Sequence, residues 1–123
     1  MTAEPATSAR RILVVEDELM IRMLLEDMLG ELGYTVTAEA ARLDEALEAA
    51  KSADFDVAIL DVNLNGQPIS PVADALVARG TPFVFATGYG ASGIPQKFRG
   101  KPFLQKPFAI HNLSQVLQTV TGG

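Results

Sequence analysis

Ile12-Leu13-Val14-Val15-Glu16-Asp17-Glu18 joins a short apolar run to three consecutive acidic residues. A fully apolar, mostly β-branched run of this length is typical of a strand that is buried on both faces of a sheet. The pattern returns at residues 57–60 (VAIL) and at residues 83–86 (FVFA). Three such runs in one short chain predict a parallel sheet inside an α/β domain.

Helical periodicity fills the segments between these runs. The first helix is predicted from apolar residues at helical spacing, and Gly33 follows where a helix end favours a left-handed residue. Its expected inner stripe is Ile21, Leu24, Leu25, Met28 and Leu32. A second helix is expected over residues 43–50, after a strand over residues 34–38.

The second half of the chain repeats this alternation. Ser70 is expected as N-cap and Pro71 as first residue of a helix that Gly80 ends. A short strand is predicted over residues 103–105, and a last helix starts at Ile110. Glycines weaken the helix candidate around residues 96–98.

This order of elements predicts a flavodoxin-like, doubly wound fold with a five-stranded parallel sheet. Right-handed crossovers give the strand order 2-1-3-4-5 along the sheet, with a weak or short fourth helix. We expect a disordered segment over residues 1–10, a single domain over residues 11–121, and no output domain.

Composition narrows the possible functions. With 123 residues, 48% of them hydrophobic, the chain fits one globular domain. The net charge of −5 argues against binding to nucleic acid, and no stretch is long enough to span a membrane. The absence of cysteine excludes disulfides and thiolate metal sites, and is compatible with the cytoplasmic location that we expect.

Chemically active side chains follow the predicted strands. The acids Glu16 and Asp17 follow the first strand, Asp61 the third, Thr87 the fourth and Lys106 the fifth. The carboxyl ends of parallel strands meet at one edge of the sheet, so these side chains are expected to converge. Clustered carboxylates repel one another and need a cation, and oxygen ligands favour Mg²⁺ where phosphate is also bound.

Lys106 and Thr87 complete the predicted site. The Lys106 ammonium can pair with Asp61 in the free state and with a phosphoryl oxygen afterwards, and Thr87 adds a neutral hydrogen-bond donor. A carboxylate that faces a metal ion and an ammonium is a plausible nucleophile for phosphoryl transfer.

These residues give the chain its resemblance to a family. From Arg11 through the last helix it resembles a bacterial two-component response-regulator receiver domain. The resemblance rests on the stretch quoted first, on Asp61 after its apolar run, on Thr87, and on Lys106-Pro107-Phe108. It implies that Asp61 accepts a phosphoryl group from a sensor histidine kinase, so the protein is a phosphoacceptor, with slow autodephosphorylation at most, and not an enzyme.

The resemblance also implies how the metal is held. Asp17 ligates Mg²⁺ directly, Glu16 contributes through water, and Asn63 offers its backbone carbonyl. The Lys106–Pro107 peptide bond is expected to be cis and to aim the ammonium at the acids. A phosphotransfer protein is a further expected partner, and the downstream partner stays open.

Phe85-Ala86-Thr87-Gly88-Tyr89 is similar to the signature of single-domain receivers called the FAT GUY group, which commonly serve in stress and phosphorelay signalling. By the resemblance, Asn63 and Tyr89 tune dephosphorylation and Phe103 holds the place of the switching aromatic. Both aromatics are also compatible with simple packing. We expect phosphorylation to reorganise the surface over residues 88–103.

Three other functions compete with this interpretation. An aspartate-nucleophile phosphatase needs a second acid where this chain has Asn63, and a nucleotide binder needs a glycine- or hydroxyl-rich loop in place of the acids after the first strand. A degenerate receiver that binds partners without being phosphorylated stays open. His111 has no partner cluster in the sequence and is expected to be solvated without a role.

Overall fold

The computed structural model describes residues 11–122, so the expected disordered segment over residues 1–10 lies outside the described residues. A five-stranded sheet forms the centre of the domain, in the order β2-β1-β3-β6-β7. All neighbouring strands in it pair in parallel. The strands are β1 (Arg11–Val15), β2 (Thr35–Ala40), β3 (Val57–Asp61), β6 (Phe83–Thr87) and β7 (Phe103–Gln105). Counted along the chain, this is the predicted order 2-1-3-4-5.

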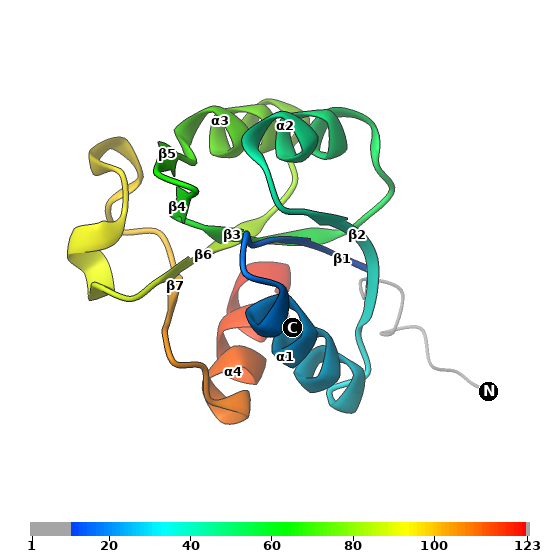
Figure 1. The fold of residues 1–123 in the computed structure, drawn as a ribbon. Helices are drawn as coiled ribbons and strands as arrows, with labels where there is room; N and C mark the ends of the chain where they lie inside the picture. Colours follow the sequence, from blue (N-terminus) through cyan, green and yellow to red (C-terminus); the bar gives the residue numbers. More distant parts are fainter. Residues whose placement is uncertain (1–10, 123) are drawn as a thin grey trace.

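Helices cover both faces of the sheet, which confirms the doubly wound fold. They are α1 (Leu19–Glu31), α2 (Leu43–Ser52), α3 (Ser70–Arg79) and α4 (Ile110–Thr121). Helices α2 and α3 lie on one face, and α1 and α4 on the other (Figure 1). In β1 the side chains alternate between the two cores, with Leu13 and Val15 facing α2 and α3, and Ile12 and Val14 facing α1 and α4. Within the described residues, no helix combines the length and apolar character that a bilayer crossing requires.

Two helix predictions need correction. In α1 the buried residues are Leu25 and Leu29, and Leu24, which was expected in the core, is 43% exposed. Consecutive helical residues point about 100° apart, so a face centred on Leu25 turns Leu24 outward. Helix α3 begins at Ser70, and its N-cap is the buried Ile69 (φ −86°, ψ −5°), whose carbonyl accepts the first hydrogen bonds of the helix. Ser70 therefore does not cap the helix.

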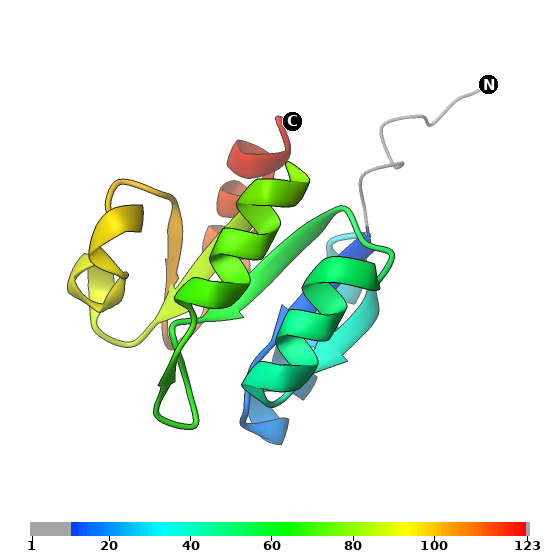
Figure 2. The same ribbon diagram turned by 90° about the horizontal axis from the view of Figure 1, so that it is seen from above.

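A small hairpin follows β3 and was not predicted. Strands β4 (Asn63–Leu64) and β5 (Gln67–Pro68) pair antiparallel around Asn65 and Gly66. Both turn residues have positive φ, 54° and 81°, as a two-residue type I′ turn requires. The Asn-Gly dipeptide was the sequence signal for this hairpin, which projects from the body of the domain in Figure 2.

A weak or short fourth helix was expected in the crossover from β6 to β7, and the structure has no α-helix there. Two short 3₁₀ turns, η2 (Gly90–Gly93) and η3 (Gln96–Phe98), replace it and lie at the β7 edge of the sheet (Figure 1). The crossover is anchored by Ile94 and Phe98, which are buried in the core beneath α2 and α3. The Phe98 ring centroid lies 5.6 Å from that of Phe85.

Replacing Phe98 with alanine is expected to lower the free energy of unfolding by about 3 kcal/mol, because it leaves a cavity under a segment with few other anchors. Urea denaturation measures the change. Tyr89→Ala is the matched control, since this aromatic of the same crossover is 80% exposed. Equal losses in the two variants would contradict the anchoring role of Phe98.

Candidate functional site

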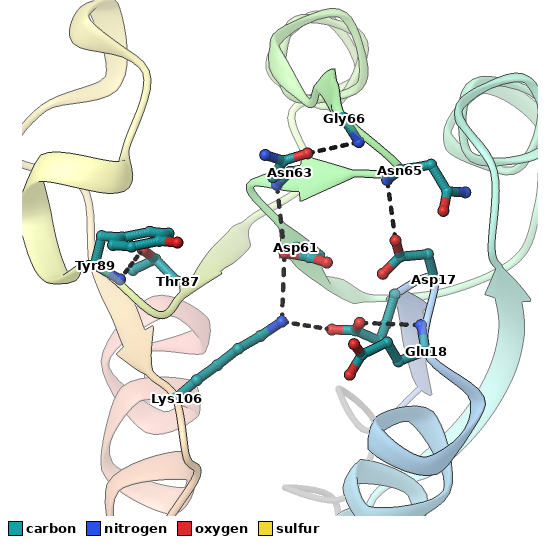
Figure 3. A network of polar contacts seen from close by, with 10 residues as sticks. Asp17, Glu18, Asp61, Asn63, Asn65, Gly66, Thr87, Tyr89 and Lys106 are labelled. Carbon is teal, nitrogen blue, oxygen red and sulfur yellow. Dashed lines mark hydrogen bonds and ion pairs between the residues drawn. The ribbon is translucent and has the colours of Figure 1, made fainter.

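An acid pocket forms where β1, β3 and β7 end. We use this name for the cavity that contains Glu16, Asp17, Asp61 and Lys106 (Figure 3). One carboxylate oxygen from each of the three acids lies within 4.8 Å of the others. The cavity has a volume of about 410 Å³, and Asn63, Gly88 and Tyr89 also line it. The predicted convergence of residues from distant parts of the chain is therefore present in the structure.

Glu16 lies at the bottom of the acid pocket. Glu16 is only 1% exposed to solvent. Its Oε1 accepts a hydrogen bond from Lys106 Nζ at 3.0 Å, and its Oε2 accepts one from the Glu18 amide at 3.1 Å. Burial raises the pKa of Glu16 to about 7 in spite of the Lys106 ammonium, and the charge of Asp61 adds to the rise. A negative charge on Glu16 is therefore costly, and a nearby cation reduces this cost.

Asp61 ends β3 and is also buried. Its Oδ1 lies 3.4 Å from Lys106 Nζ and accepts a hydrogen bond from the Asn63 amide at 3.3 Å. Burial raises the pKa of Asp61, and the ammonium only partly opposes this. Burial also lowers the pKa of Lys106, but the two carboxylates outweigh it and the net shift is upward. Lys106 therefore stays charged and is shared between Glu16 and Asp61.

Asp17 is the most exposed of the three acids. Its Oδ2 accepts a hydrogen bond from the Asn65 amide at 3.0 Å. Burial favours the neutral form, but the interaction with the Glu16 side chain and the hydrogen bond from the Asn65 amide outweigh it and lower the pKa of Asp17. Asn65 was missed as a site residue, because the hairpin that carries it was not predicted.

Thr87 and Tyr89 sit at one side of the acid pocket. Thr87 ends β6, is fully buried, and is not among the residues that line the cavity. Its hydroxyl accepts a hydrogen bond from the Tyr89 amide at 2.9 Å. The Tyr89 side chain is 80% exposed, so it does not pack in the core.

Phe103 and His111 lie outside the acid pocket. Phe103, in β7, is half-buried against the core beneath α2 and α3. The Lys106–Pro107 peptide bond is cis, as the resemblance implied. His111 is exposed at the start of α4, as expected.

The donor set of the acid pocket fits a hard divalent cation. The three closely spaced side chains offer only carboxylate oxygens, which Mg²⁺ prefers, and the described residues place no imidazole or sulfur beside them. The raised pKa values of Glu16 and Asp61 point the same way, because a cation relieves the cost of burying their charges.

The fold and the pocket together define a class of protein. A doubly wound sheet with an acidic site at the switch point between β1 and β3 is a CheY-like flavodoxin fold. The chain belongs to the response regulator receiver domain family, whose model matches residues 12–118.

Comparisons with known proteins agree with this assignment. The transcriptional regulatory protein PdtaR of Mycobacterium tuberculosis is 32% identical over 121 residues, which cover 95% of this chain and 59% of PdtaR. The chain thus spans about three fifths of the length of that relative.

Solved structures of receivers are also similar. The solution structure of SdrG from Sphingomonas melonis Fr1 has a TM-score of 0.82 and 42% identity, covering 91% of this chain and 96% of that one. The BeF3-activated conformation of SdrG from Pseudomonas melonis Fr1 gives 0.75 and 45%, covering 87% and 92%. The receiver domain of the sensor histidine kinase PA1611 from Pseudomonas aeruginosa PAO1, with a magnesium ion coordinated in its active site cleft, gives 0.79 and 26%, covering 94% and 100%.

Proposed function

We propose that residues 11–121 form a receiver that takes a phosphoryl group onto Asp61 in a Mg²⁺-dependent reaction. The phosphoryl donor is a histidine kinase or a phosphotransfer protein. The signal is passed on through protein contacts or through onward transfer of the phosphoryl group, and both take place in the cytoplasm. The observation that carries this proposal is the acid pocket, where Asp61 lies within 4.8 Å of two other carboxylates and beside the Lys106 ammonium.

In the proposed reaction an Asp61 carboxylate oxygen attacks the phosphorus of a phosphohistidine. An O–P bond forms, the N–P bond breaks, and its electron pair stays with the imidazole nitrogen, which takes a proton from solvent. Lys106 moves from its shared position between Glu16 and Asp61 to a phosphoryl oxygen. Positioning and charge neutralisation of this kind provide most of the catalysis in phosphoryl transfer.

Oxygen ligands of the acid pocket would hold the metal ion. Asp17 and Asp61 would bind Mg²⁺ directly, Asn63 through its backbone carbonyl, and Glu16 through water. When bound, the ion supplies positive charge that offsets the crowded acids and the phosphoryl oxygens. The hydrogen bond from Asn65 keeps Asp17 in the pocket, ready for this role.

We also propose that the chain is a receiver of the FAT GUY type, with a role in stress or phosphorelay signalling. The residues Phe85 to Tyr89 support this. Asn63 and Tyr89 both line the acid pocket, where they would tune the lifetime of the acyl phosphate. Phe103 would act as the switching aromatic, and its half-buried position against the core is compatible with this role.

Mass spectrometry after treatment with acetyl phosphate tests the proposal. A stable addition of one phosphoryl group with Mg²⁺, and none with EDTA, supports the receiver. Rapid turnover of a phosphate ester without accumulation would indicate the phosphatase, and no addition in any condition would indicate a degenerate receiver.

An apolar surface on α1 supports a protein as the phosphodonor. The surface consists of exposed side chains in the first two turns of the helix, Leu19, Met20, Met23 and Leu24. Helix α1 begins directly after Glu18, so this α1 surface adjoins the acid pocket. A donor protein that covers it would bring a phosphohistidine close to Asp61.

Replacing Met20 with glutamate is expected to slow phosphotransfer from a cognate kinase by about tenfold, because a central apolar contact is lost. Labelling by acetyl phosphate should stay unchanged, since this small donor needs no docking surface. Val77→Glu is the control, because Val77 is an apolar residue that is 55% exposed on α3, on the opposite face of the sheet. Equal slowing with both donors in Met20→Glu would contradict the docking role.

A further inference from the structure

The hydroxyl of Thr87 occupies a defined position outside the acid pocket. It accepts the hydrogen bond from the Tyr89 amide at 2.9 Å, and Thr87 is completely buried. In Figure 3 its side chain lies against Tyr89, at a distance from the Asp61 carboxylate across the pocket. If Thr87 is to contact a phosphoryl group on Asp61, its hydroxyl has to leave this position.

Gly93, the last residue of η2, faces this hydroxyl. A Cβ atom at Gly93 would lie 2.3 Å from Thr87 Oγ1 and 3.3 Å from Thr87 Cβ. The first distance is far below any van der Waals contact, so a side chain at this position and the hydroxyl exclude each other. Only a residue without Cβ permits the observed position of Thr87.

The glycine is required at this position for space and not for backbone conformation. Gly93 is not among the described glycines with positive φ, whereas Gly90, at the start of the same turn, has a φ of 62°. An alanine at 93 is thus compatible with the backbone. By contrast, a Cβ at Gly88, next to Thr87, would meet no atom within 4 Å.

We propose that Gly93 is a positioning residue. Its missing side chain leaves a space that the Thr87 hydroxyl occupies, away from Asp61, in the unphosphorylated protein, and we call this space the seat. The inference rests on the proposed function and on the role that the sequence predicts for Thr87, a neutral hydrogen-bond donor to the phosphoryl group. It adds to that function the position beside Gly93 from which the Thr87 hydroxyl moves. When the Thr87 hydroxyl leaves the seat, the Tyr89 amide loses its hydrogen-bond acceptor. Phosphorylation of Asp61 is thereby linked to the exposed Tyr89 and to η2.

The test measures the Thr87 side-chain torsion by NMR, from three-bond couplings of its Cγ2 to the backbone nitrogen and carbonyl carbon. We expect Gly93→Ala to change these couplings in the free protein. We also expect the variant to bind fluoroberyllate with Mg²⁺ about fivefold more tightly, because the competing hydrogen bond of the free state is already lost. Ser92→Ala is the control, since it removes only the bond from Ser92 Oγ to the Tyr89 carbonyl at 2.7 Å and adds no bulk near Thr87.

Unchanged couplings in folded Gly93→Ala would overturn the inference, because η2 would then have moved in place of the hydroxyl. Equal effects of Ser92→Ala on the couplings would overturn it too. If Gly93→Ala does not fold, the wild type decides: its Thr87 couplings must change on fluoroberyllate binding, and constant couplings would refute the seat. If the wild type binds no fluoroberyllate, the proposed function fails, while the couplings of free Gly93→Ala still report on the seat.

Discussion

Asp61→Asn is expected to eliminate phosphorylation by acetyl phosphate and Mg²⁺, with a fall in rate of at least about a thousandfold. The amide is a poor nucleophile, and no other carboxylate in the acid pocket has the position of Asp61 between Lys106 and Asn63. Intact-mass measurement over time reports the loss. Asp44→Asn is the matched control, because this exposed acid on α2 contacts Arg42 and the Glu45 amide at the surface, away from the acid pocket.

The melting temperature of Asp61→Asn shows whether the loss of phosphorylation is due to unfolding. The pKa of Asp61 is raised by burial, so ionised Asp61 costs stability at every pH above its unfolded pKa. Removing that charge is expected to leave the melting temperature at pH 7 unchanged or higher, since Lys106 keeps Glu16 as a partner. A phosphoryl group found on Asp61→Asn would show that another residue is the acceptor.

The sheet and the convergence of the acid pocket were predictable from sequence for one physical reason. Strands buried on both faces must be apolar throughout, so the first polar residue after each run marks its carboxyl end. Glu16 and Asp61 could be assigned to one edge in this way, although they come from different strands. Lys106 was assigned to the same edge because it follows the predicted last strand. For the glycine-rich β6–β7 crossover a weak or short helix was predicted, and the structure has two 3₁₀ turns there.

Features that depend on side-chain geometry were not predictable in this way. The exposure of Leu24 depends on how α1 is rotated against the sheet, and apolar composition alone does not fix that rotation. The contact between Asn65 and Asp17 depends on the hairpin, whose Asn-Gly signal gives a turn but not its direction. The close approach of Gly93 to Thr87 has no sequence signature, because glycine serves equally well in any turn.

Lys106→Met is expected to lower the free energy of unfolding by about 2 kcal/mol at pH 7 in EDTA. It removes the only ammonium that contacts Glu16 and Asp61 in the described part of the chain, and breaking a buried ion pair by deleting one partner costs about 3–5 kcal/mol. The expected loss is smaller because the Lys106 side chain is 22% exposed. Glu16, with a pKa of about 7, can also take up a proton once the cation is gone.

The same variant tests whether a metal ion and Lys106 serve one electrostatic purpose. If Mg²⁺ binds the acid pocket, it replaces the missing positive charge, so it should raise the stability of Lys106→Met more than that of the wild type. Urea titrations of both proteins with Mg²⁺ and with EDTA measure the difference. Lys97→Met is the control, because Lys97 pairs with exposed Asp74 at 2.8 Å and contributes little. A Mg²⁺ effect of equal size in all three proteins would mean that the ion acts elsewhere, and the acid pocket would lose its role as the metal site.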